Sequence, residues 1–165
     1  MPFTPFHFGA GILIGLLLRK YIDFPTFVAA NLIVDVRATL IFFGFMDGNL
    51  HGFLHTFLFG SLLGLGLALV AYRLKPFTGQ IMEFFKLEQL DNWKGFLVAG
   101  VLGTWIHIFL DSFLYADIQP FMPLTVNPFY GLLSTPNFII YGFSLVSLIL
   151  GGAYYLYLLW LEPDI

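Results

Sequence analysis

The chain has 165 residues, of which 59% are hydrophobic and only 10% are charged. Soluble domains carry roughly 25% charged residues, so this composition, with a mean hydropathy of +0.87, predicts an all-α, polytopic helical membrane protein that forms a single domain over residues 1–165. The absence of cysteine excludes disulfides and thiolate metal ligands, and a net charge of −3 without a basic cluster argues against nucleic acid as a partner.

The sequence predicts five transmembrane helices and one interfacial helix. The first span, 6–18, is short for a full crossing, which takes about 17–25 residues. The second span, 24–45, carries Asp35 and Arg37 near its middle. Each ionisable residue there costs roughly 2.5–3.5 kcal/mol on insertion scales, so a functional role is the default interpretation.

The third span is predicted over 51–72, with Gly60, Gly64 and Gly66 on a face where another helix can pack closely. The segment that follows, 79–94, mixes aromatic and aliphatic residues with charged ones. This pattern is typical of an amphipathic helix that lies on the membrane surface.

The fourth span is predicted over 95–115 and the fifth over 138–160. The four prolines between them, in 117–137, exclude a regular span and indicate an ordered loop that caps a site. Six of the seven Lys and Arg residues lie in the connections after the first and third spans. The positive-inside rule therefore places these connections, and the interfacial helix, on the cytoplasmic side.

The four histidines lie beside or within apolar helical sequence. On a helix, the four-residue spacing of His51 and His55, and of His107 and Asp111, brings each pair to one face, as metal ligands require. Depths of roughly 15 Å for Asp35 and 12 Å for His107, at 1.5 Å per residue, place the candidates in the outer, extracytoplasmic half of the membrane. The predicted metal ligands are His7, Asp35, His51, His55, His107 and Asp111.

Imidazole and carboxylate ligands favour zinc, one to three ions, with manganese as the alternative. A metal-bound hydroxide would then be the nucleophile, with Asp35 and Asp111 as the catalytic carboxylates. Because a site below the membrane surface meets lipids first, we expect membrane lipids as partners and a lipid or lipid-linked phosphoester as substrate. The oligomeric state stays open.

Arg37 points away from Asp35 on an ideal helix. It therefore snorkels, pairs structurally or, if the helix is broken there, contacts a substrate anion. Asp47 and Asp117 flank the site and are interpreted as solvated turn residues, with support of a ligand or of a further metal as the alternative.

Other interpretations compete with a hydrolase. His51 and His55 alone could cap an interfacial helix, and His107 could simply pair with Asp111. A proton or metal-ion transporter or channel would line its path with the same His and Asp residues, but would spread them along the whole bilayer depth. A haem held by two histidines is disfavoured by the carboxylates.

Five short motifs follow one another in a distinctive order: Pro2-Phe3-Thr4-Pro5-Phe6-His7, Val34-Asp35, His51-Gly52-Phe53-Leu54-His55-Thr56, His107-Ile108-Phe109-Leu110-Asp111 and Asn127-Pro128-Phe129. Together they resemble the YdjM-like predicted membrane-bound metal-dependent hydrolases over most of the chain. That family is distantly similar to zinc-dependent phospholipase C, which holds zinc with clustered His and Asp on helices. The resemblance implies a helical metallohydrolase acting on phosphoesters, and we expect it in a prokaryotic cell membrane.

The second span departs from the family pattern. In the family the aspartate is often followed two residues later by glutamate and then proline, whereas Arg37-Ala38 stand here. If that glutamate is a ligand or base in relatives, the departure implies fewer metals, another substrate or loss of activity.

Overall fold

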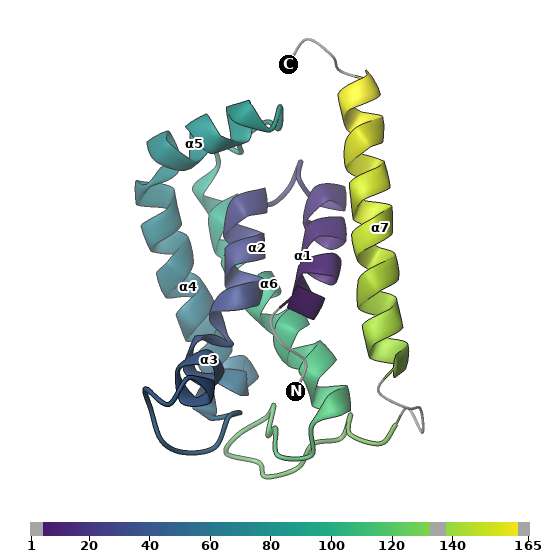
Figure 1. Ribbon diagram of the computed structural model, residues 1–165. Helices are drawn as coiled ribbons and strands as arrows, with labels where there is room; N and C mark the ends of the chain where they lie inside the picture. Colours follow the sequence, from purple (N-terminus) through teal and green to yellow (C-terminus); the bar gives the residue numbers. More distant parts are fainter. Residues whose placement is uncertain (1–4, 133–137, 162–165) are drawn as a thin grey trace.

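The computed structural model describes residues 5–132 and 138–161. These residues form α-helices and one 3-10 turn, η1, and contain no strand: α1 (Pro5–Leu17), α2 (Phe24–Ile33), α3 (Val36–Phe42), η1 (Phe53–His55), α4 (Phe57–Arg73), α5 (Lys75–Phe84), α6 (Trp93–Leu114) and α7 (Phe138–Leu161). Helix α6 packs against α4 and α2, and α1 packs against α7 and α2. Helix α5 lies across one end of the bundle, and α3 lies at the other (Figure 1).

Helices α6 and α7 are long and apolar enough to cross a membrane. The pairs α2–α3, bent by 42°, and α4–α5, bent by 80°, would raise the number of candidate spans to four, while α1 is a shorter apolar helix. The expectation of an all-helical, membrane-compatible chain is confirmed. The five-span arrangement stays a prediction.

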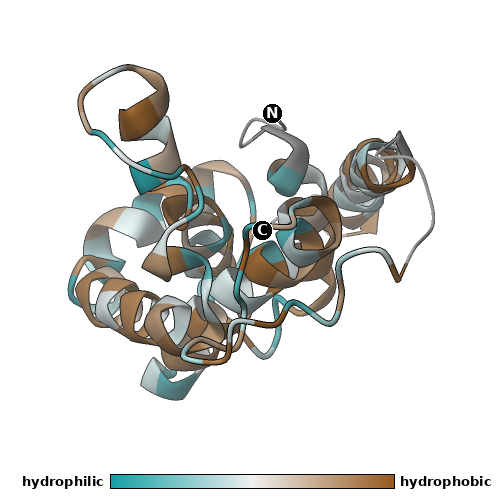
Figure 2. Cartoon of the chain, turned by 90° about the horizontal axis from the view of Figure 1, so that it is seen from below, coloured by the Kyte–Doolittle hydropathy of each residue, from teal (hydrophilic) through white to brown (hydrophobic). Residues whose placement is uncertain are grey.

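The outward faces of the helices are strongly apolar. Leu58, Leu62 and Leu69 of α4 and Val146 and Ile149 of α7 are all more than half exposed, and the end view in Figure 2 shows hydrophobic residues on the outside of the bundle. Exposed apolar surface of this kind marks contact with another protein or with a membrane. It suits contact with lipid.

Close backbone approach joins α4 to α6. A Cβ at Gly64 would overlap the Gly100 carbonyl oxygen, whereas a Cβ at Gly66 would meet no atom within 4 Å. The small-residue face expected on this helix is therefore real, but Gly66 is not part of the contact. Close helix approach through small residues is the usual way membrane helices associate.

The second span is broken, not continuous as predicted. In an unbroken α-helix the Asn31 carbonyl would accept from the Asp35 N–H. Here it accepts from His107 Nδ1 at 2.6 Å, and the Asp35 N–H donates instead to the Leu32 carbonyl at 3.2 Å. A side chain inserted into the helical ladder is a known cause of kinks, and this one separates α2 from α3 at residues 34–35.

The interfacial helix also differs from its predicted bounds of 79–94. Helix α5 begins at Lys75, because Pro76 fits the first turn, where its missing N–H costs nothing. It ends at Phe84, and Lys86 has a φ of 52°, a conformation that does not continue a helix. Residues 85–92 are non-helical.

The described part of the proline-rich loop, 117–132, contains turns and no helix, as predicted. The Asn127 amide donates to the carbonyls of Ser112 at 2.9 Å and Tyr115 at 3.1 Å, which ties the loop to the end of α6. The Pro120 carbonyl accepts from the first amide of α4, that of Phe57, at 2.9 Å. Residues 133–137 of the predicted loop lie outside the described residues.

Candidate metal centre

Four buried side chains converge at the end of the bundle that holds α3. Asp35 comes from the break between α2 and α3, His55 from η1, and His107 and Asp111 from successive turns of α6. One ligand atom from each lies within 4.8 Å of the others. These four residues are called the Asp35 cluster below. They can hold a metal ion.

His107 is the best oriented of the four. Its Nδ1 lies 2.6 Å from the Asn31 carbonyl, which can only accept, so Nδ1 carries the proton. In the neutral ring Nε2 then presents its lone pair, 3.3 Å from Asp35 Oδ1 and 3.3 Å from Asp111 Oδ2. Fixing the tautomer through the far nitrogen is how proteins prepare a histidine for a metal.

His55 reaches the cluster from a 3-10 turn and not from a helix. Its Nε2 lies 3.4 Å from Asp35 Oδ1 and 3.7 Å from Asp111 Oδ2. The predicted helix from His51 is wrong, since α4 begins at Phe57. Thr56 sets this start, because its hydroxyl accepts from the Phe59 amide at 3.2 Å and donates to the Phe53 carbonyl at 2.9 Å.

The donor set fits a divalent ion. Tetrahedral zinc with bonds of roughly 2.0–2.1 Å holds its ligand atoms roughly 3.3–3.4 Å apart, close to the nitrogen–oxygen separations around Asp35 and Asp111. Among the described residues, His55 Nε2 and His107 Nε2 are buried without a hydrogen-bond partner. Buried carboxylates and unpaired buried nitrogens are costly without a compensating partner, and one cation would satisfy both.

His7 lies beside the Asp35 cluster. Its Nε2 is 3.1 Å from Asp111 Oδ1, and its ring stacks on His107 with centroids 4.0 Å apart. The contact has ion-pair distance but is not an aligned hydrogen bond, since Asp111 Oδ1 has no such partner among the described residues. His7 is thus placed to position Asp111 and His107.

His51 lies outside the four-residue group. Its Nδ1 is 3.1 Å from both carboxylate oxygens of Asp117, and its ring centroid is 5.0 Å from that of His55. Asp117 is therefore paired with a histidine and is not merely a solvated turn residue. The structure brings five of the six predicted ligands into contact around Asp111 and Asp35, and leaves His51 at the rim of this site.

Sequence reasoning missed Tyr115, which follows the last residue of α6 and lies against His51 with ring centroids 4.1 Å apart. The Tyr115 phenol can donate a hydrogen bond. The sequence could have indicated this position, because Tyr115 follows Asp111 by four residues and would lie one turn further along the same face of the predicted helix. Asn31 was missed too, although a polar residue one turn before Asp35 carried the same signal.

Arg37 is paired structurally. Its guanidinium donates to the Asn49 carbonyl, and a Cβ at Gly52 would lie 2.5 Å from Arg37 Nη1. Arg37 thus holds the loop that leads into η1 and His55. A contact with a substrate anion stays a prediction.

Comparison of the chain with family models, with curated proteins and with solved structures finds no match. The resemblance to YdjM-like proteins therefore depends on the short motifs alone and stays a prediction.

Proposed function

We propose that this protein is a membrane-embedded, metal-dependent hydrolase that cleaves a phosphoester in a lipid or lipid-linked molecule. The observation that carries the proposal is the Asp35 cluster, in which two imidazoles and two carboxylates are buried with ligand atoms within 4.8 Å of one another. Imidazole with carboxylate favours zinc, with manganese as the alternative. A catalytic zinc takes three protein ligands and one water, so three members of the cluster would bind one ion, and a second ion would need His51 and Asp117.

A divalent ion bound there supplies Lewis acidity and lowers the pKa of a coordinated water. The protein's own groups orient the ligands: the Asn31 carbonyl fixes the ring of His107, and His7 contacts Oδ1 of Asp111. Because a catalytic zinc takes three protein ligands and one water, one of the two buried carboxylates, Asp35 or Asp111, is left beside the ion as the proposed proton acceptor. Tyr115, whose ring lies against His51, is the proposed hydrogen-bond donor to an oxygen of the substrate.

We place five spans in the membrane, namely α1, the pair α2–α3, α4, α6 and α7, with α5 on the cytoplasmic surface. Six of the seven cationic residues follow α1, end α4, begin or follow α5, or lie in the first turn of α6, which is the end of the bundle that carries α5 in Figure 1: Arg19, Lys20, Arg73, Lys75, Lys86 and Lys94. The positive-inside rule then supports a metal centre near the extracytoplasmic face of a prokaryotic cell membrane.

The exposed helix faces support a lipid substrate. Only 17% of the most apolar window of α7 is buried inside the fold, so most of this helix is available to lipid. A metal centre that lies among such helices is reached more readily by a molecule already in the bilayer than by a soluble metabolite. Phosphoesters are the proposed target because metal-activated water and a Lewis acid suit their hydrolysis.

The decisive experiment is elemental analysis of detergent-purified protein. We expect about one equivalent of zinc or manganese, because ligand atoms that all lie within 4.8 Å of one another surround a single ion, and we expect its loss in a still-folded His55→Ala/Asp111→Ala variant. His51→Gln is the matched control, because His51 lies outside the four-residue group, and it should keep the ion. Hydrolysis of phosphoester lipids should follow the metal content.

Absence of metal, even after growth and purification with added zinc and manganese, would contradict the hydrolase proposal. It would favour a proton-handling transporter or a purely structural role for the Asp35 cluster. Metal bound equally by the double variant would show that the Asp35 cluster is not the site.

A further inference from the structure

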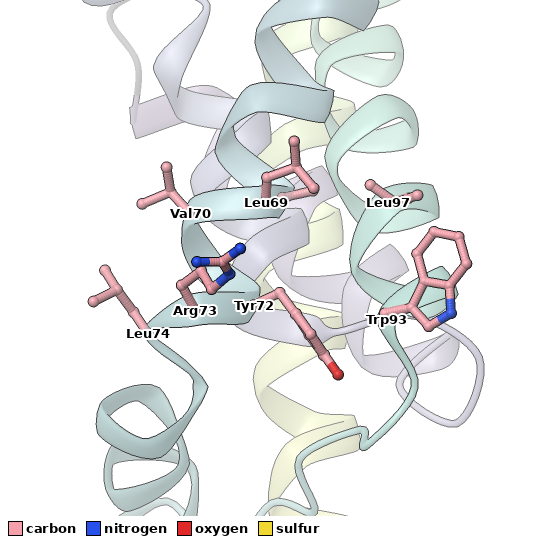
Figure 3. A pocket seen from close by; sticks show the side chains of 8 residues that line it. Leu69, Val70, Tyr72, Arg73, Leu74, Trp93 and Leu97 are labelled. Carbon is pink, nitrogen blue, oxygen red and sulfur yellow. The ribbon is translucent and has the colours of Figure 1, made fainter.

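A second site lies at the opposite end of the bundle from the Asp35 cluster. A groove of about 530 Å³ runs between the last turns of α4 and the first turns of α6, within the range of roughly 300–1,000 Å³ typical of small-molecule sites. Figure 3 shows Leu69 of α4 and Leu97 of α6 along it. At 1.5 Å per residue, Arg73 in this groove lies about 24 Å along α4 from Phe57, so the two sites are separate.

Arg73 is the charged residue of the groove lining. It is exposed, and no hydrogen bond or ion pair joins it to any residue in the described ranges. Two other cations at this end are engaged, since Lys75 pairs with Asp91 and Arg19 donates to the Tyr154 hydroxyl at 3.0 Å. Lys20 and Lys94 are exposed but do not line the groove. An unpaired guanidinium beside apolar walls is well suited to a phosphate, which it can bind with two parallel hydrogen bonds.

The level of the groove in the bilayer follows from its neighbours. Helix α5 turns away from α4 by 80° directly after Arg73 and exposes Phe77 and Phe84, as a helix lying in the membrane surface would. Tyr72 and Trp93 line the groove at the same height (Figure 3), and such rings collect at the headgroup level. Arg73 is then level with lipid phosphates, and the apolar walls extend from it into the acyl region.

We propose that this groove binds an anionic phospholipid, with its phosphate on Arg73 and part of one acyl chain along Leu69 and Leu97. Charge complementarity selects this occupant: the headgroup level carries an unpaired cation, and the rest of the lining is apolar or aromatic. A neutral or zwitterionic lipid would fill the apolar groove equally well, but would gain less from Arg73. The site does not depend on the metal centre.

Native mass spectrometry of the full-length protein, released from detergent with added phosphatidylglycerol or phosphatidylcholine, tests the proposal. We expect retained phosphatidylglycerol to exceed retained phosphatidylcholine, and Arg73→Gln to cut phosphatidylglycerol binding about fivefold, the effect of roughly one cation at a membrane surface. Lys20→Gln is the matched control, because it removes an exposed cation at the same end that does not line the groove. It should retain the lipid.

A second pair of variants tests the acyl-chain part of the site. Leu69→Trp fills the groove from an exposed position, whereas Leu62→Trp adds the same ring to α4 away from the lining. We expect only Leu69→Trp to reduce lipid binding. Equal losses in Arg73→Gln and Lys20→Gln, or full binding in Leu69→Trp, would overturn the proposal. A change of oligomeric state in Leu69→Trp without loss of lipid would assign the groove to a second copy of the chain instead.

Discussion

Replacing His7 with phenylalanine removes one nitrogen contact from the candidate metal centre and keeps the aromatic ring. His7 Nε2 is 3.1 Å from Asp111 Oδ1, while its ring stacks on His107 at 4.0 Å. The phenyl ring can preserve the stack, so the variant isolates the contact with the carboxylate. Both partners are buried, and water therefore cannot easily replace the lost contact.

The expected magnitude follows from the place of His7 outside the four-residue group. Groups that orient a metal ligand typically contribute 10–100-fold to metal affinity, which corresponds to about 1.4–2.8 kcal/mol. Only one contact is lost in His7→Phe, and Asp111 keeps its 3.3 Å approach to His107 through the other oxygen. We therefore expect weaker zinc binding, not its abolition.

Competition with a chromophoric zinc chelator, on detergent-purified protein at fixed pH, measures this affinity. His51→Gln, outside the four-residue group, is the control, and the thermal midpoint without metal checks the fold. An affinity within twofold of the wild type would refute the positioning role of His7. Complete loss of binding in a folded variant would show instead that His7 is itself a ligand.

Further predictions concern packing, capping and pH. Gly64→Ala forces a Cβ onto the Gly100 carbonyl oxygen, and we expect this overpacking to cost about 1–3 kcal/mol of folding stability and to lower the thermal midpoint. Gly66→Ala is the control, because a Cβ there meets open space. Equal midpoints in the two variants would contradict the α4–α6 contact. Thr56→Val removes the N-cap hydroxyl of α4 and should lower folding stability by about 1 kcal/mol. It should also weaken zinc binding, because the cap fixes the turn that carries His55. Unchanged stability and zinc affinity would contradict this role of Thr56. Burial raises the pKa of Asp23, the N-cap of α2, from 3.8, so its contribution to stability falls as pH rises from the unfolded value through the folded one. The denaturation midpoint of Asp23→Asn should therefore change less with pH than that of the wild type across this pH range. An equal pH dependence in the two proteins would contradict the prediction.

Composition and local periodicity predicted the helices and part of the site. The four-residue spacing of His107 and Asp111 places both on one face of α6, because this segment is a regular helix in the structure. The same rule failed for His51 and His55, since it presupposes a helix. Gly52 and Thr56 interrupt that segment, and the preference of Thr for the N-cap was a local signal for a later start.

The break at Asp35 could not be predicted from local pattern. It arises where His107, far along the chain, takes the carbonyl of Asn31. Hydropathy describes only local composition, so 24–45 reads as one apolar segment. A break caused by a hydrogen bond from a distant residue cannot be detected in this way. The predicted bounds of the interfacial helix were wrong for a more local reason, since the prediction began at residue 79, whereas Pro76 fits the first turn of a helix that begins at Lys75.

The hydrogen bond from His107 to Asn31 links the fold to the site. It directs His107 Nε2 toward Asp35 and Asp111, and it also withdraws the carbonyl that would have continued α2 past Asp35. The helix break and the ligand orientation are thus two consequences of one contact. The chain changes direction at Asp35, and α3 leaves at 42° to α2. This explains how an aspartate in an apolar segment reaches two histidines of other elements, His107 on α6 and His55 in η1. A carbonyl freed by a helix break is costly in apolar surroundings unless it is satisfied, and here the His107 ring satisfies it.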